Sequence, residues 1–208
     1  ASDFNDTVWP RLRLPQPELT VSGANPRPFF HPYSKAMVFS RGSFNIADHA
    51  PIKECVLNLK YFGGVAIYVN GKEVARGHLP AGQDGELAVA EDYADEAFVT
   101  EQGKPIGTTD ASNKERLALR ERTLNEIKVP VNLLRAGINV VAIQNVTAPL
   151  PAVIGKGKFG QDCGGKGWPP VGLLEAEVKI TTGCATPSAR PNGLQVWNVN
   201  NCETVTSF

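Results

Sequence analysis

The residue types that could carry catalysis are few and scattered along this chain. The three histidines, His31, His49 and His78, lie far apart in the sequence and belong to no metal-ligand motif. There is no Gly-x-Ser-x-Gly element for a nucleophilic serine, and the glycine-rich stretch 155–167 lacks the Lys-Ser/Thr ending of a phosphate loop. Glycoside hydrolysis needs two carboxylates at a set separation, whereas the acids here fall mainly on outward strand faces or in the segment 91–96. The pattern favours binding over catalysis.

Two aromatic residues lie beside polar side chains in segments with little strand pattern. Trp168 is in the glycine-rich run 164–170, where a bulky ring is hard to bury by regular packing. Tyr93 directly follows Glu91 and Asp92 in an acidic segment. Recognition of a polyol uses an aromatic face for stacking and charged or amide groups for the hydroxyls. These four residues are therefore candidate ligand contacts.

Arg116 and His78 are the further polar contacts that we expect for such a site. Each aromatic also has a plain structural interpretation. Trp168 would then close the end of the domain, and Tyr93 would pack down with Phe98 and leave the neighbouring acids solvated. The sequence leaves both interpretations open.

A metal ion is a second kind of ligand that the sequence allows. Calcium takes six to eight oxygen ligands from carboxylates, carbonyls and amides. The fold resemblance described below implies that a calcium ion, if present, would be held by Asp3, Asp6 and Asp48, with Glu175 or Glu177. None of them has the spacing of an EF-hand loop, so a chain that needs no metal or other cofactor is the equal alternative.

The four cysteines are Cys55, Cys163, Cys184 and Cys202, and none forms a close Cys-x-x-Cys pair of the kind that binds zinc. An even number in a loop-rich protein favours disulfides and an oxidising compartment. Cys184 and Cys202 flank a loop rich in proline and glycine, so we expect them to pair, which leaves Cys55 for Cys163. Four cysteines allow three pairings, and free buried thiols are the alternative.

Composition narrows the class of protein further. The chain has 208 residues, enough for one large β domain, and its 21 basic residues equal its 21 acidic ones. A zero net charge argues against nucleic acid or an anionic membrane as the partner, because both attract clustered positive charge. No apolar run approaches the roughly 18–20 residues of a membrane span. The chain also starts without a leader pattern, so we expect a mature secreted protein or an excised module.

Alternation of apolar and polar residues predicts an all-β fold. The strongest signal is Asn70-Gly71 between two short apolar runs, because a type I′ turn needs positive φ at both central residues. Pro130–Gly137 is expected to hold one helical turn. The expected strands cover 37–46 with an interruption at Gly42, 55–61, 65–69, 72–75, 125–129, 138–146, 174–180 and 193–199.

Three segments lie outside this pattern. We expect residues 1–33 to form an irregular arm anchored by Trp9. Residues 183–208 are expected to form a last strand, with Trp197 in the core, and a tail closed by a disulfide. Residues 78–122 are long, polar and weakly patterned, which is uncommon in a compact domain unless the loop is functional. We expect one domain over 1–208, a β-sandwich with jelly-roll or Greek-key wiring, long loops and little helix.

Two stretches resemble a known family. Gly63–Gly77, with its Tyr-Val-Asn-Gly-Lys hairpin, precedes Val129–Ile143, with its Leu-Leu-Arg-Ala-Gly-Ile-Asn-Val-Val unit. Together with the opening Phe4–Pro10, they resemble the galactose-binding-like jelly rolls. These include the sugar-binding domain of β-galactosidases and β-glucuronidases and bacterial carbohydrate-binding modules. The resemblance covers about Asn5–Ile180 and implies the sandwich fold, often with one structural calcium ion. It does not fix the ligand, because this fold hosts many functions.

The leading hypothesis is a non-catalytic carbohydrate-binding module of a secreted polysaccharide-processing or cell-surface protein, of bacterial type. Its partner would be a polysaccharide or oligosaccharide, bound in or beside the loops 78–122 and 155–170. One alternative is a structural or protein-interaction module of a large bacterial extracellular or envelope complex. Another is a fragment of an enzyme whose catalytic domain lies elsewhere in its parent chain.

Overall fold

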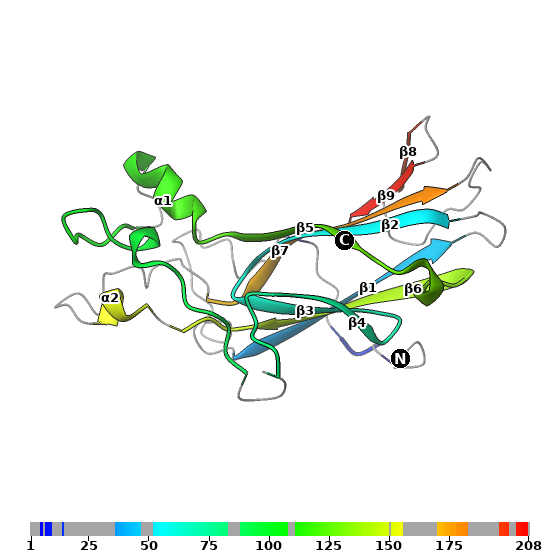
Figure 1. Cartoon of the computed structure of the whole chain (residues 1–208), viewed down its shortest axis with the longest axis horizontal. Helices are drawn as coiled ribbons and strands as arrows, with labels where there is room; N and C mark the ends of the chain where they lie inside the picture. Colours follow the sequence, from blue (N-terminus) through cyan, green and yellow to red (C-terminus); the bar gives the residue numbers. More distant parts are fainter. Residues whose placement is uncertain are drawn as a thin grey trace.

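The fold is an all-β sandwich of two antiparallel sheets that face each other (Figure 1). The computed structural model describes residues 5, 7–9, 14, 36–46, 52–82, 88–107, 111–149, 151–155, 170–182, 196–199 and 203–207. The expected all-β class is confirmed. Short helices and loops gather at one end of the sandwich, where α1 and α2 lie in Figure 1.

The two sheets have four and five strands. The four-stranded sheet has the order β1-β6-β3-β4, formed by Met37–Ile46, Gly137–Val146, Gly64–Val69 and Lys72–Gly77. The five-stranded sheet has the order β5-β2-β7-β9-β8, formed by Arg122–Lys128, Ile52–Phe62, Gly172–Thr182, Glu203–Ser207 and Val196–Val199. The helical elements among the described residues are the 3-10 turns η3 (Asp95–Ala97), η4 (Ala111–Asn113) and η5 (Val131–Leu133) and the helices α1 (Lys114–Ala118) and α2 (Ala152–Gly155).

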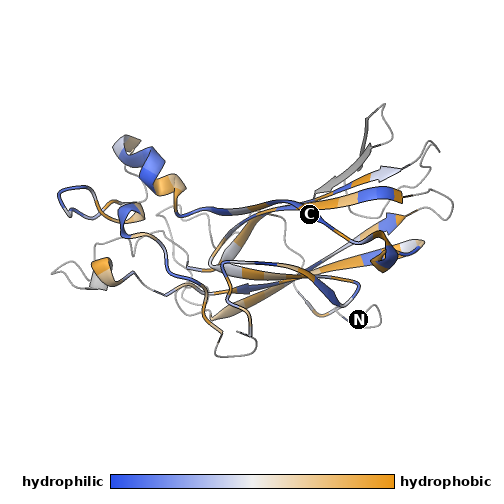
Figure 2. Cartoon of the chain, viewed as in Figure 1, coloured by the Kyte–Doolittle hydropathy of each residue, from blue (hydrophilic) through white to orange (hydrophobic). Residues whose placement is uncertain are grey.

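The core lies between the sheets because alternate residues of each strand point inward. On β2 the buried residues include Leu57, Leu59 and Tyr61, and on β7 they include Val178 and Ile180. Figure 2 shows hydrophobic residues along the strands of both sheets and hydrophilic ones over much of α1. The residues that alternate with the core on β2 and β7 therefore form the outer face of the five-stranded sheet.

The hairpin between β3 and β4 is confirmed with its predicted turn. Asn70 has a φ of 49° and Gly71 a φ of 84°, as a type I′ turn requires. The Asn70 side chain also fixes a third strand, since its Oδ1 accepts a 3.0 Å hydrogen bond from the backbone N–H of Val140. Its Nδ2 donates to Oδ1 of the buried Asn139 at 2.8 Å. One turn residue thus joins the hairpin to β6.

Several sequence predictions need correction. β1 runs without interruption through Gly42, which pairs with Val141 in a continuous register. The last strand expected from residue 193 begins at Val196, and β9 after it was not predicted. The segment 78–122 contains η3, η4 and α1 where a loop was expected. Trp9 is half-buried, while the side chain of Trp197 lies outside the described residues.

Cys55 is a free, buried thiol, so the expected disulfide to Cys163 is wrong. Its side chain points into the core from β2, and burial raises its pKa to about 12. Cys163, Cys184 and Cys202 lie outside the described residues, and the pairing of the last two stays a prediction.

Within the described part of the chain, no helix has the length and apolar character to cross a bilayer.

Candidate functional site

Three of the predicted loop residues, Glu91, Asp92 and Tyr93, contact Arg122, the first residue of β5. Its guanidinium is buried and donates to three backbone carbonyls: Gly63 at 2.9 Å, Glu91 at 2.9 Å and Asp92 at 2.8 Å. It also lies 3.7 Å from the centroid of the Tyr93 ring. Charged donors to buried carbonyls form strong hydrogen bonds. Arg122 therefore holds the loop around residues 91–93 on the end of the sandwich.

Tyr93 is part of this packing and offers no open face. It is 7% exposed, its hydroxyl oxygen accepts a 2.9 Å hydrogen bond from the Gly63 N–H, and Phe98 packs edge-on against its ring. Burial raises the pKa of the Tyr93 hydroxyl. Its expected role as a stacking platform is wrong, because the ring is buried and Arg122 covers one of its faces. Glu91 and Asp92 are exposed beside it, as the structural interpretation expected.

Two more arginines hold the rest of this loop. Arg120 is buried over the ring of Phe98 and donates to the carbonyls of Ala97 at 2.9 Å and Ile106 at 2.8 Å. Arg116, a predicted ligand contact, donates to the carbonyl of Val99 at 3.2 Å and to other oxygens of the same loop. These two side chains donate hydrogen bonds to backbone carbonyls of the segment 96–106 and so hold that segment in place.

His78 is also held by the protein. Its Nδ1 lies 2.9 Å from the hydroxyl of Tyr61, and its own carbonyl accepts a hydrogen bond from the N–H of Glu91 at 2.9 Å. The residue has a φ of 52°, in the left-handed region that few non-glycine residues adopt. Burial, with a smaller effect from the charge of Arg122, lowers the pKa of His78. A neutral imidazole suits this position.

The remaining predicted residues divide into two groups. Trp168, Asp3, Asp6 and Asp48 lie outside the described residues. Glu175 and Glu177 lie on β7. No three His, Cys, Asp or Glu side chains gather to hold a metal ion in the part of the chain that the structure describes.

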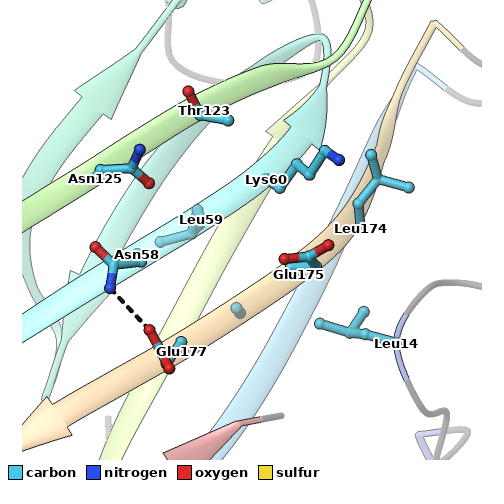
Figure 3. A pocket seen from close by; sticks show the side chains of 10 residues that line it. Leu14, Asn58, Leu59, Lys60, Thr123, Asn125, Leu174, Glu175 and Glu177 are labelled. Atoms are coloured by element: carbon cyan, nitrogen blue, oxygen red, sulfur yellow. Dashed lines mark hydrogen bonds between the residues drawn. The ribbon is translucent and has the colours of Figure 1, made fainter. Parts of the chain in front are cut away.

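The outer face of the five-stranded sheet carries a cavity of about 430 Å³ that the sequence did not reveal. We call it the sheet-face pocket. Figure 3 shows polar side chains of β5, β2 and β7 beside one another and Leu14 next to β7. Its lining comprises Leu14, Asn58, Leu59, Lys60, Thr123, Asn125, Leu174, Glu175, Ala176 and Glu177.

The strand register arranges the polar residues in rows across the sheet. Lys60 pairs with Thr123 of β5 on one side and with Glu175 of β7 on the other, and Asn58 pairs with Glu177. Neighbouring strands lie about 4.8 Å apart and alternate residues of a strand roughly 6.7 Å apart. The polar surface is therefore comparable in size with one or two sugar rings.

Asn58 is fixed at the floor of the pocket by a bulge in β5. Its Nδ2 donates to Oε2 of Glu177 at 2.9 Å, and its Oδ1 accepts from the backbone N–H of Glu126 at 2.8 Å. Glu126 has a φ of 57°, where the register of β2 with β5 shifts between Leu57 and Leu59. A bulge leaves ladder groups unpaired, and Asn58 satisfies one of them. The orientation of both side chains is thereby set before any ligand arrives.

Lys60 is engaged at the edge of the pocket. Its Nζ lies 2.6 Å from Oε2 of Glu121. The hydrogen bond to Glu121 raises the pKa of Lys60, and the charges of Glu121 and Glu175 add to this effect. The side chain therefore carries a full positive charge that is largely balanced by carboxylates.

Three polar side chains of the pocket remain open. Thr123, Asn125 and Glu175 are exposed and have no hydrogen-bond partner among the described residues. They lie on strands, which hold side chains more precisely than loops do. Leu14 and Leu174 add apolar surface at the β7 side. The pocket can offer hydroxyl, amide and carboxylate groups to a polar ligand.

Sequence reasoning had placed Glu175 and Glu177 outward as a solvated face. Sequence reasoning missed the pocket because its polar members come from three strands that are distant in the sequence. Asn58 and Glu177, for example, are 119 positions apart. The role of Arg122 was missed for the same reason, because the acceptors are backbone carbonyls far along the chain.

Comparisons with known proteins give limited information. No family model and no curated protein match the chain. An α-L-rhamnosidase of Streptomyces avermitilis, solved with L-rhamnose, has a similar region with a TM-score of 0.32 and 16% identity, covering 71% of this chain and 9% of that one. An α-L-rhamnosidase of Dictyoglumus thermophilum gives a TM-score of 0.33 and 14% identity over 70% and 11%. The chain thus spans about a tenth of each enzyme, and similarity at this level carries no argument about ligand or activity.

Proposed function

We propose that this chain is a non-catalytic carbohydrate-binding module of the galactose-binding-like jelly-roll type, and that it binds glycan in the sheet-face pocket. The observation that carries the proposal is the contrast between two polar regions of the chain, the loop region around Arg122 and the sheet-face pocket. The polar groups of the loop region are held by internal contacts, as with Arg122 and His78. Thr123, Asn125 and Glu175 in the pocket face solvent on rigid strands.

The pocket has the donors and acceptors that sugar hydroxyls need. Asn125 offers a carbonyl oxygen and an NH₂ group, Thr123 a hydroxyl, and Glu175 two acceptor oxygens. Leu14 and Leu174 supply apolar surface for the C–H face of a ring. Because the pocket is small and open, we expect weak binding, with a Kd roughly between 10 μM and 1 mM.

The function needs no catalytic group and no metal ion in the pocket. Such a module would belong to a secreted or cell-surface protein that processes or holds a polysaccharide, a setting that suits the predicted disulfide between Cys184 and Cys202. A structural calcium ion held by Asp3, Asp6 and Asp48 and a second contact from Trp168 remain proposals beside it.

The test is a glycan array or affinity-gel screen of the 208-residue chain against plant, algal and microbial glycans. The Asn125→Ala variant should lose retention, and a matched change of an exposed asparagine outside the pocket, Asn132→Ala, should keep it. Trp168→Ala, run beside them, tests the loop contact. Absence of binding to every glycan would refute the proposal, and loss of binding in Trp168→Ala alone would move the site to the loop.

The alternative of a protein-interaction module receives less support. Such a module would show an exposed apolar patch. The most exposed large apolar side chains of the four-stranded sheet are Phe39, at 58%, and Ile138, at 63%. Phe39 pairs with Gln144, six positions along β6 from Ile138, so the two lie apart.

A further inference from the structure

We infer that the sheet-face pocket selects glycans by charge: it prefers amino sugars that carry an ammonium group, binds neutral sugars less tightly and binds uronic acids and sulfated sugars most weakly. The inference rests on the proposed function and names its ligand class. It follows from the distribution of charged groups in and beside the cavity.

Carboxylates outnumber cations at the pocket. Glu175 and Glu177 line it from β7, and Glu121 lies at its edge against Lys60. Among the described residues, the cations at the pocket are Lys60 and, outside the lining, Lys179, whose Nζ lies 3.8 Å from Oε2 of Glu177. Three described carboxylates thus face two described ammonium groups, which leaves one excess negative charge in this part of the structure.

That excess charge belongs to Glu175. Glu177 is engaged by the Asn58 amide and lies near Lys179, and Glu121 pairs with Lys60 at 2.6 Å. Glu175 has no ion pair within 4.0 Å among the described residues, although it is close enough to add to the field at Lys60. An ammonium group on a bound sugar could donate a charge-assisted hydrogen bond to the carboxylate of Glu175.

An acidic sugar would meet the opposite situation. The only cation in the described lining is Lys60, and its ammonium group already contacts Glu121. An incoming carboxylate or sulfate would have to share that ammonium group while lying next to Glu175. The negative group of the sugar and the carboxylate of Glu175 would repel each other. Acidic glycans should therefore bind more weakly than neutral ones of the same length.

The experiment compares three sets of oligosaccharides of equal length by isothermal titration calorimetry: glucosamine oligomers, their N-acetylated counterparts and galacturonic acid oligomers. It is run at mildly acidic pH and low salt, where the amines are protonated and the carboxylates ionised. The variants are Glu175→Gln, which keeps the shape and removes the charge, and Glu115→Gln, which removes the same charge from exposed α1 outside the pocket.

We expect the glucosamine oligomers to bind about two- to fivefold tighter than the N-acetylated ones, as one exposed charge pair allows. Glu175→Gln should remove this preference, because it should lower the affinity for glucosamine oligomers more than the affinity for N-acetylated ones. Glu115→Gln should keep the preference, and galacturonic acid oligomers should bind most weakly. Two results would overturn the inference and leave the proposed function standing. One is binding of glucosamine and N-acetylated oligomers with equal affinity, and the other is a preference for glucosamine oligomers that survives Glu175→Gln. Failure of every glycan to bind would refute both.

Discussion

The guanidinium of Arg122 lies 3.7 Å from the centroid of the Tyr93 ring, on the end of the sandwich. The contact joins the first residue of β5 to a loop about 30 positions earlier in the chain. It covers one ring face of the aromatic residue that the sequence put forward for ligand binding. The segment around residues 91–93, which the sequence predicts as a polar loop, is therefore held by the buried guanidinium of Arg122. The acceptors are the carbonyls of Gly63, Glu91 and Asp92.

Loss of this cation should destabilise the fold strongly. In Arg122→Ala, three carbonyls lose a charged donor and a cavity opens beside Tyr93, so we expect a loss of about 3 kcal/mol or more in the free energy of unfolding. Arg116→Ala, in which the arginine is more exposed, should cost about 1 kcal/mol. Urea denaturation of the wild type and of the two variants measures these differences in the free energy of unfolding. Equal stability of wild type and Arg122→Ala would contradict the assigned role.

The burial of His78 should make the free energy of unfolding depend on pH. The pKa of His78 is lowered by burial, so the unfolded chain binds the proton more readily than the folded one. The contribution of His78 is therefore complete above its unfolded pKa near 6.5 and is lost as the pH falls from there toward the lower folded pKa.

The measurement is urea denaturation between about pH 7.5 and about pH 5. His78→Asn is the informative variant, because asparagine tolerates the positive φ at this position and does not titrate in this range. It should flatten the fall in stability below pH 6.5. A variant that declines as steeply as wild type would assign the pH dependence to another group.

The Cys55 thiol should be inert in the folded protein. Burial in the core raises its pKa to about 12, so almost no thiolate forms at neutral pH. Alkylation followed by mass spectrometry should modify the peptide that contains Cys55 only after denaturant is added, with no reductant present. If modification required a reductant as well, Cys55 would be part of a disulfide.

The sequence predicted those features that depend on neighbouring residues. The type I′ turn at Asn70-Gly71 and the alternation along β2 and β7 are local, so their strands were recognisable. The interruption expected at Gly42 was wrong, because pairing with Val141 keeps the glycine in the sheet.

The candidate sites could not be predicted in the same way. The loop candidates were chosen by residue type, but whether Tyr93 is open depends on Arg122 from a different strand. The pocket depends on the order β5-β2-β7, which places Asn125, Asn58 and Glu177 in one region of the sheet face. Such proximity between distant segments exists only after the sheet has formed.

The most direct test of glycan binding in the sheet-face pocket is an NMR titration of the isotope-labelled chain with the oligosaccharide that binds best in the screen. The account predicts saturable shifts of backbone amides concentrated on the three strands of the pocket, at Asn58, Lys60, Thr123, Asn125, Glu175 and Glu177. Shifts confined to residues 155–170 around Trp168, or no saturable shifts with any glycan, would contradict it.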